Sequence, residues 1–161
     1  MRGSLLQSSV IGSGFAGIIC AWAALVTGRY DVWQAGFVAS FCSKLSDTVS
    51  SEVGKGFGKT TYLVTNFSRV PPGTEGAVSV EGSVAGIVAA VVYAFAATVL
   101  GQVTVVGALS CAAAASIANL AESYIGATTQ DSVSWLTNDV VNVIQICIAA
   151  ALGVAFFVNL Q

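Results

Sequence analysis

Apolar stretches of about 20 residues recur along this chain, and a helix of that length crosses the roughly 30 Å hydrocarbon core of a bilayer. Only 9% of the side chains are charged, whereas an average soluble domain carries about 25%. The stretches are continuous and rich in Ala and Gly, and this pattern disfavours a transmembrane β-barrel. The sequence therefore predicts an all-α fold, a polytopic transmembrane helical bundle, as one integral-membrane domain over residues 1–161.

About five spans are predicted, and a Gly/Pro-rich polar loop separates the second from the third. We expect the glycines of the first span to allow close helix packing. All four cysteines fall inside apolar stretches without a CxxC pair, which favours small buried side chains over a metal or redox role. The predicted spans cover residues 10–26, 34–54, 80–100, 105–125 and 135–160.

Several classes of function are disfavoured. The net charge is −2 and no basic-aromatic patch is present, so no nucleic-acid partner is expected. The chain contains no His, which removes His-based catalytic dyads and most zinc sites. The run GKGFGKTT follows a predicted membrane helix, whereas a nucleotide-binding P-loop follows a β-strand.

Eight of the fourteen charged side chains lie within residues 44–82. Ionisable groups in membrane segments are rare and mark functional sites by default, although ion pairs between helices are the alternative. At 100° per residue, the polar side chains of the second span fall within an arc of about 140°. These side chains are Lys44, Asp47, Thr48, Ser51, Glu52 and Lys55.

The other polar groups lie near the ends of later segments. Pro71 and Pro72 disfavour helix, so residues 55–79 are predicted to form an ordered loop or re-entrant turn. Glu81 falls in the first turn of the third span, where a carboxylate suits the helix dipole. Polar stripes end the fourth span and begin the fifth: Ser116, Asn119 and Glu122, then Asn138, Asn142 and Gln145 with Asp139 beside them.

Alternating spans place the N-terminus, the loop at residues 55–79 and the loop containing Asp131 on one side of the membrane. More Lys and Arg residues lie on this side than on the side of Arg29, so it faces the cytosol or the stroma. Four segments then place carboxylates and amides in one layer below the same surface.

This layer suits phosphate and metal chemistry. Mg²⁺ takes carboxylate and amide oxygens together with phosphates, and phosphates take cations and glycine-rich turns. Predicted catalytic residues are Asp47, Glu52 and Asp139, and predicted Mg²⁺ ligands are Asp47, Glu122, Asn119, Asn138 and Asp139. Predicted nucleotide and phosphate contacts are Lys55, Lys59, Arg69, Gly73, Thr74, Glu75 and Gly76, supported by Lys44, Ser51, Glu81 and Asn142.

Three long motifs carry a resemblance to a known family: SKLSDTVSSEVGKGFGKTTYLVTNFSRVPPGTEGAVSVEGSVAG, SIANLAESYIGA and WLTNDVVNV. They closely resemble the plant and cyanobacterial phytyl-phosphate kinases of the vitamin E pathway. These enzymes belong to a membrane family, long labelled as of unknown function, that includes an animal transmembrane protein. The resemblance implies a kinase that uses a nucleoside triphosphate such as CTP to convert phytyl or another prenyl monophosphate into the diphosphate for tocopherol and phylloquinone synthesis.

The resemblance also implies where the protein is located and which other enzyme families share its motifs. It implies a chloroplast or cyanobacterial membrane, the lipid bilayer as a partner, and relatives with further N-terminal spans that this chain lacks. The Asp-Thr, Gly-Lys and Glu-Gly pattern is similar to that of phytol and dolichol kinases and CDP-diacylglycerol synthases. The Lys-Lys before their Glu-Gly is PPGT here, which leaves Arg69 as the nearest cation.

Two alternatives remain open. A cytidylyltransferase-like lipid enzyme would use the same ligands and release pyrophosphate. A transporter would need polar groups through the full depth of the membrane, and the far halves of the third, fourth and fifth spans are almost purely apolar.

Overall fold

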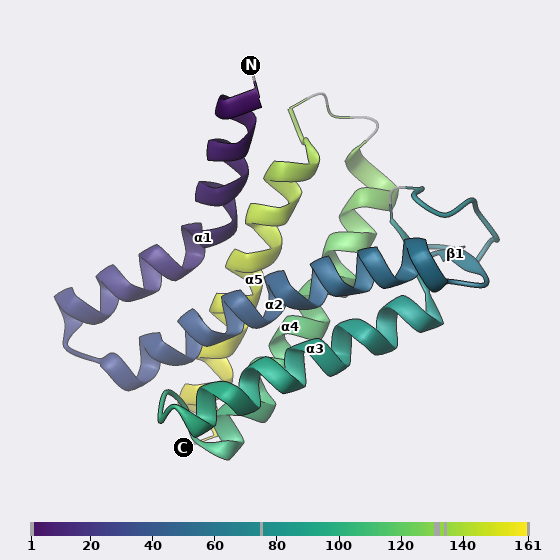
Figure 1. Ribbon diagram of the computed structural model, residues 1–161. Coiled ribbons are helices and arrows are strands. Elements are labelled where there is room, and N and C mark those ends of the chain that lie inside the picture. The colour runs from purple at the N-terminus through teal and green to yellow at the C-terminus, as the bar shows by residue number, and fades with distance from the viewer. Residues whose placement is uncertain (1, 75, 131–132, 134, 161) are drawn as a thin grey trace.

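The fold is described from a computed structural model that covers residues 2–74, 76–130, 133 and 135–160. This part of the chain forms five α-helices, as predicted (Figure 1). The connections after α1 and α3 are short, whereas the one between α2 and α3 is long. A π-helical turn, η1 (Gly126–Gln130), extends the fourth helix. The helices are α1 (Arg2–Thr27), α2 (Tyr30–Phe57), α3 (Val80–Val99), α4 (Val105–Ile125) and α5 (Asn138–Asn159).

Three of the helices begin at a hydroxyl side chain. Ser79 accepts a hydrogen bond from the backbone N–H of residue 82 and starts α3. Thr104 and Thr137 make the equivalent bonds at the starts of α4 and α5. Each such cap typically stabilises a helix by about 1 kcal/mol. The caps therefore explain why α5 begins three residues later than the predicted span at residue 135.

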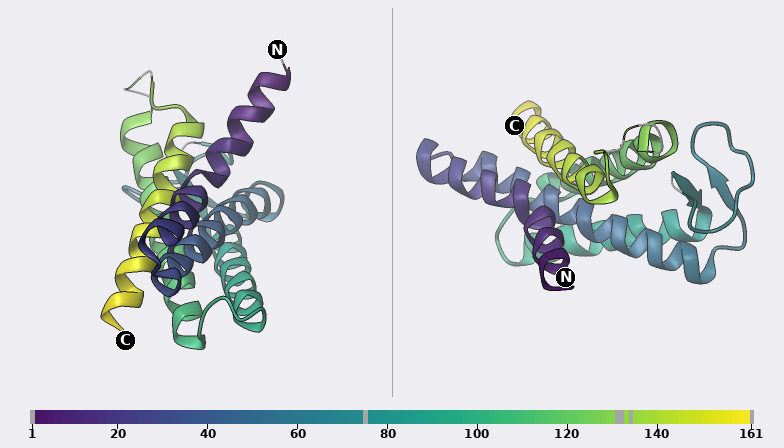
Figure 2. Two further views of the ribbon diagram at one scale, coloured as in Figure 1. Left: turned by 90° about the vertical axis from the view of Figure 1, so that its left-hand side faces the viewer. Right: turned by 90° about the horizontal axis from the view of Figure 1, so that it is seen from above.

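Helix α2 lies at the centre and packs against each of the other four helices (Figures 1 and 2). Helices α2 and α3 run side by side in opposite directions, and α1 packs on α2 and α5. At one end, Gln34 Nε2 donates to Gln102 Oε1 at 2.5 Å, which links the start of α2 to the α3–α4 turn. The end of α2 and the chain that follows it lie at the other end.

Small side chains fill the interface between the helices, as expected in a membrane bundle. The buried core is mostly Ala and Cys, including Ala39, Cys42, Ala90 and Cys111, each fully buried. Three of the four cysteines are buried and the fourth is half-buried, and all are free thiols, as predicted. In α1, Gly17 lies against the ring of Phe41, whereas Gly14 has no neighbour, so the predicted close packing holds for only some of its glycines.

Among the described residues, three helices are long and apolar enough to cross a membrane. The apolar part of α1, Gly12–Thr27, is shorter, and α2 carries the polar face. The span prediction is therefore met most fully by the C-terminal half of the chain, in Val80–Val99, Val105–Thr129 and Asn138–Asn159.

The connection between α2 and α3 differs from the prediction in one respect. Helix α2 continues to Phe57, past the predicted end of its span at residue 54, and the chain then forms a two-stranded antiparallel hairpin. Its strands are β1 (Thr61–Leu63) and β2 (Ala77–Ser79), with Thr61 opposite Ser79. The hairpin was not predicted because strands of three residues show no alternation of polar and apolar side chains that a sequence pattern could reveal.

Candidate functional site

A polar cavity of about 300 Å³ lies at the hairpin end of the bundle. Helix α2 forms one wall, the hairpin and its loop form the second, and the end of α4 and the start of α5 form the third. All six side chains of the predicted polar arc of α2 line it, because the helical period places them on one face. The remaining predicted residues in its lining are Gly73, Thr74, Gly76, Asn119, Glu122, Asn138 and Asn142.

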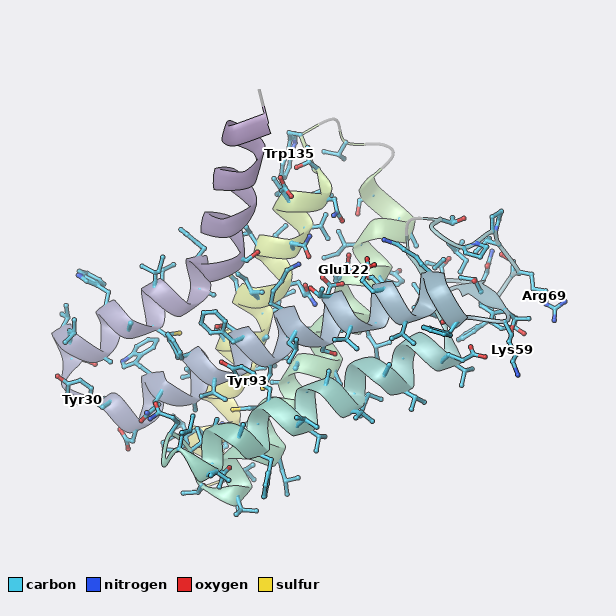
Figure 3. The ribbon with its side chains drawn as sticks, in the orientation of Figure 1. Tyr30, Lys59, Arg69, Tyr93, Glu122 and Trp135 are labelled. Atoms are coloured by element: carbon cyan, nitrogen blue, oxygen red, sulfur yellow. The ribbon has the colours of Figure 1, made fainter. Side chains whose placement is uncertain are left out.

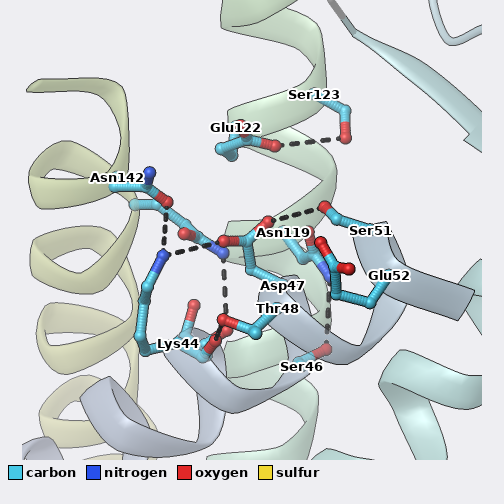
Figure 4. Close-up of polar contacts among 12 residues, drawn as sticks. Lys44, Ser46, Asp47, Thr48, Ser51, Glu52, Asn119, Glu122, Ser123 and Asn142 are labelled. Carbon is cyan, nitrogen blue, oxygen red and sulfur yellow. Dashed lines mark hydrogen bonds and ion pairs between the residues drawn. The ribbon is translucent and has the colours of Figure 1, made fainter. Parts of the chain in front are cut away.

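Lys44 and Asp47 form an ion pair in the wall of this cavity. Lys44 Nζ lies 3.0 Å from Asp47 Oδ2 and also donates to Asn142 Oδ1 of α5 at 2.8 Å (Figure 4). Ser51 Oγ donates to the second carboxylate oxygen of Asp47 at 3.5 Å. Asp47 is only 9% exposed, so these partners compensate for the loss of water around its charge.

Helix α4 brings a second carboxylate to the cavity. Asn119 Nδ2 donates to Ser46 Oγ at 3.2 Å, which ties α4 to the central helix. One turn later, Glu122 lines the cavity and accepts a hydrogen bond from Ser123 Oγ at 3.4 Å. Figure 4 shows Asp47 and Glu122 approaching from different helices. Two carboxylates that are 75 positions apart in the sequence therefore share one site.

The loop between the strands covers one side of the cavity. Thr74 closes a turn on Pro71, with its side-chain oxygen donating to the Pro71 carbonyl at 2.8 Å. Gly76 has φ +70°, and a Cβ there would lie 2.4 Å from the Cβ of Ala127. The loop can therefore pack against the end of α4 only with glycine at residue 76. The predicted contact at Glu75 lies outside the described residues.

Glu52 and Lys55 lie in the exposed part of the cavity wall. Lys55 Nζ is 3.7 Å from Glu52 Oε1, and the two side chains are 59% and 72% exposed. An exposed pair of this kind contributes little to stability, because water screens it and two long side chains must be held. Both charged groups are therefore free to exchange their partner for an entering ligand.

Four of the predicted site residues do not line the cavity. Lys59 and Arg69 lie at the outer end of the hairpin (Figure 3). The backbones of Arg69 and Tyr62 pair within the hairpin. Hydrogen bonds with the side chains of Thr60, which has the larger effect, and of Arg69 lower the pKa of the Tyr62 hydroxyl below its usual value. The guanidinium is thus engaged with the hairpin.

The other two residues outside the lining are Glu81 and Asp139. Each sits in the first turn of its helix, where a carboxylate suits the helix dipole. Asn138 and Asn142 share one face of α5 and line the cavity, whereas Asp139 is rotated by 100° from Asn138 and does not line it. Asp139 was predicted as a site residue because it follows Asn138 in the sequence, but adjacent residues of a helix point in different directions.

The donor set of the cavity suits a hard cation only in part. Among the described residues no group of three Asp, Glu, Cys or His side chains is gathered closely enough to hold a metal ion alone. Mg²⁺ usually binds through one or two carboxylates plus the phosphates of a ligand. Asp47 and Glu122, with the amides of Asn119 and Asn138, fit that pattern.

Sequence reasoning missed part of the lining. Thr61 and Ser79 pair across the hairpin, and both line the cavity. Thr61 is 8% exposed and its Oγ1 has no hydrogen-bond partner among the described residues. Ser43 Oγ and Gln145 Oε1, at the α2–α5 interface, are also buried without a hydrogen-bond partner among the described residues. A single threonine in a three-residue strand gives no signal in the sequence.

A family described as integral membrane protein DUF92 matches residues 6–150 of the chain. The protein VTE6, chloroplastic, of Arabidopsis thaliana is 51% identical over 152 residues, which is 91% of this chain and 46% of that protein. An uncharacterised membrane protein of Synechocystis is 44% identical over 95% of this chain and 60% of its own length.

A third relative comes from an archaeon. An uncharacterised membrane protein of Methanocaldococcus jannaschii is 33% identical over 78% of this chain and 52% of its own length. The chain thus spans about half the length of the curated relatives it matches. No solved structure matches it significantly.

Proposed function

Since this chain belongs to the DUF92 family of integral membrane proteins, we propose that it is a membrane phosphotransferase acting on a lipid phosphate. The substrate is phytyl monophosphate or another prenyl monophosphate, the donor is a nucleoside triphosphate such as CTP, and the product is the prenyl diphosphate used for tocopherol and phylloquinone synthesis. The resemblance to phytyl-phosphate kinases supplies this substrate. The chloroplastic and cyanobacterial relatives support a plastid or cyanobacterial membrane, with the cavity facing the stroma or cytosol.

One observation carries the proposal. A cavity with three carboxylates, two lysines and a glycine-rich loop lies at one end of an otherwise apolar helical bundle. Charged side chains in such a bundle cost free energy, so their presence indicates a function. Phosphoryl transfer needs mainly positioning and neutralisation of charge, which these groups provide without a nucleophile on the protein.

In this proposal, Lys44 and Lys55 face the negatively charged phosphates, and the loop at residues 72–76 closes over them. Asp47 and Glu122, with Asn119 and Asn138, would hold Mg²⁺, which when bound neutralises phosphate charge and orients the oxygens. Lys44 is fixed by Asp47 and Asn142, so its charge is positioned before substrate enters. The exposed Glu52–Lys55 pair opens to admit the donor.

The step balances without a covalent intermediate on the protein. A phosphate oxygen of the prenyl monophosphate attacks the γ-phosphorus of the donor. The bond between that phosphorus and its bridging oxygen breaks, and the nucleoside diphosphate leaves. The cavity residues neutralise the charge of both groups and hold them in line.

Product analysis tests this function. Full-length protein, purified and reconstituted in lipid vesicles, is incubated with Mg²⁺, phytyl phosphate and each of the four nucleoside triphosphates. We expect phytyl diphosphate and an equal amount of nucleoside diphosphate. Release of pyrophosphate with a nucleotidyl lipid would support the cytidylyltransferase-like alternative. Absence of any reaction, with uptake of solute into the vesicles, would support the transporter.

A further inference from the structure

A second, smaller cavity of about 90 Å³ adjoins the polar cavity between α2, α3 and α4. The two cavities lie next to each other, because they have four lining residues in common: Ser50, Val78, Asn119 and Ser123. We call the second cavity the lateral groove. Its other lining residues are Ser46, Ser83, Ile87, Ser116 and Leu120.

The helix arrangement creates the lateral groove. Helices α3 and α4 are joined by a short turn and diverge toward the hairpin, and α2 packs against both of them (Figure 1). Gly86 lets α3 lie on the backbone of α2, because a Cβ there would come within 2.9 Å of the Ser46 carbonyl oxygen. The Asn119–Ser46 hydrogen bond holds α4 on the other side.

The rim of the groove is apolar and faces outward. Ile87 is 50% exposed and Leu120 is 57% exposed, and their neighbours Val84 and Ile117 are exposed as well. Both helices are apolar enough to cross a membrane, so these exposed faces meet lipid. The outer part of the groove therefore faces the hydrocarbon of the bilayer, and its inner part adjoins the polar cavity.

Among the five serines of the groove, Ser46, Ser116 and Ser123 already have hydrogen-bond partners within the protein. Ser116 Oγ donates to the Ala112 carbonyl of its own helix at 2.9 Å, and Ser46 Oγ accepts from Asn119. Serine is also small, so it leaves room that a larger apolar side chain would fill. A narrow channel lined by small side chains suits an unbranched or methyl-branched hydrocarbon chain.

We propose that the lateral groove holds the first isoprene units of the lipid phosphate, so that the substrate enters sideways from the bilayer and delivers its phosphate to the polar cavity. This inference rests on the proposed function and specifies where its lipid chain lies. Ile87 and Leu120 contact the chain at the membrane boundary. Ser83 and Ser116 leave space for it, and Asn119 stands where the chain ends and the phosphate begins.

Another apolar groove, of about 350 Å³, lies between the end of α1 and the start of α2 and contains Trp33 and Phe37. This groove is a poor binding site for the isoprenoid chain of the substrate, because packed side chains separate it from the polar cavity. The rings of Phe37 and Phe41 are 4.9 Å apart, and Phe41 is pressed against Gly17. A chain lying there could not place its phosphate beside Asp47.

Photolabelling of the full-length protein tests the route directly. A phytyl phosphate analogue with a diazirine in the isoprene unit next to the phosphate is added to protein in lipid vesicles, and labelled peptides are mapped by mass spectrometry. We expect labels on α3 near Ile87 and on α4 near Leu120, removed by excess unlabelled phytyl phosphate. Competable labels near Trp33 and Phe37 would overturn the route but leave the substrate in place. No competable label anywhere would overturn both.

Kinetics of two variants supply an independent readout. Ser83→Leu narrows the groove and should raise KM for phytyl phosphate at least about tenfold, with the KM for the nucleotide unchanged. The KM for a five-carbon isoprenyl phosphate should rise less, since little of it occupies the groove. Val88→Phe, which also adds bulk but on the exposed face of α3 outside the groove, should change neither constant. Equal effects of both variants on both lipid substrates would contradict the proposal.

Discussion

Asp47 shows how much a single charged residue in this chain depends on its neighbours. Its carboxylate has Lys44 on one oxygen and Ser51 on the other, and Lys44 is held in turn by Asn142. These contacts join two helices that are far apart in the sequence. A charge that is 9% exposed is tolerated because this network replaces the water it has lost.

Replacement of Asp47 by Asn should abolish the proposed activity while the protein still accumulates. The amide oxygen of Asn can still accept from Lys44, so the fold is kept, but the negative charge needed at the metal and phosphate site is gone. We expect phytyl diphosphate formation in purified membranes to fall by roughly 100-fold or more.

The matched control is Asp31→Asn. Asp31 lies in the first turn of the same helix, is exposed, and does not line the polar cavity. Its activity and its level in membranes should equal those of the wild type. Retained activity in Asp47→Asn, or equal loss in both variants, would remove Asp47 from the site.

At the scale of single elements, the connection between α2 and α3 decides the shape of the cavity. Its loop turns back at Pro71 and Thr74 and then packs against α4 through Gly76. The polar composition of residues 55–79 predicted an ordered connection. Its direction depends on one close contact, between Gly76 and the chain around Ala127 at the end of α4.

Two glycine variants distinguish the effect of losing the contact between the loop and α4 from the effect of backbone strain. Gly73 and Gly76 both have positive φ, so alanine strains either position by about 1 kcal/mol. Only at Gly76 does the added Cβ collide with Ala127, whereas at Gly73 it meets no atom within 4 Å. We therefore expect Gly76→Ala to weaken nucleotide binding, measured by calorimetry, much more than Gly73→Ala. Similar losses would show that the loop does not need its contact with α4.

The crossing of α2 and α3 also depends on a glycine. A Cβ at Gly82 would lie 2.5 Å from the Ser50 carbonyl oxygen, so Gly82→Ala must push the two helices apart. Overpacking of this kind costs about 2 kcal/mol, measured as the free energy of unfolding in detergent.

The control for this crossing is Gly14→Ala in α1, where a Cβ meets nothing within 4 Å. Alanine is favoured over glycine in a helix by roughly 0.5 to 1 kcal/mol, so this variant should be at least as stable as the wild type. Equal destabilisation by both variants would mean that α2 and α3 are not held at the described distance.

For the whole molecule, the arrangement places the polar cavity at one end and the Gln34–Gln102 contact at the other. The hairpin and the end of α4 belong to the cavity end, and the start of α2 belongs to the opposite end (Figure 1). The polar segments therefore lie at one end of the bundle, and their position on one side of the membrane stays a prediction.

Labelling of introduced cysteines from one side of sealed vesicles tests this arrangement. Ser68→Cys in the hairpin and Thr128→Cys after α4 should react with a membrane-impermeant maleimide from the same side. Asp31→Cys at the start of α2 should react only after the vesicles are opened, or only in vesicles of the opposite orientation. The native cysteines are buried or half-buried and should give a low background. Reaction of Ser68→Cys and Asp31→Cys from one side would contradict the topology.

The sequence by itself determined the number and approximate bounds of the helices, because apolar length and helical period are local properties. The same period predicted that the charged face of α2 would point one way, and the count of spans predicted that Glu122 and Asn142 would meet it. Only the tertiary structure decided which charges line the cavity. Arg69 and Asp139 were both predicted as site residues, but neither lines the cavity. The Arg69 side chain is hydrogen-bonded to Tyr62 in the hairpin, and Asp139 is exposed in the first turn of α5.

The lateral groove likewise could not be predicted from the sequence. It exists because α3 rests on the backbone of α2 at Gly82 and Gly86 while α4 is held at Ser46, so that two neighbouring helices diverge. The angle between packed helices follows from contacts between side chains distant in the chain, which no local pattern records. The charged stretch predicted that a site exists, and the packing of apolar helices around it decided its shape and where it opens.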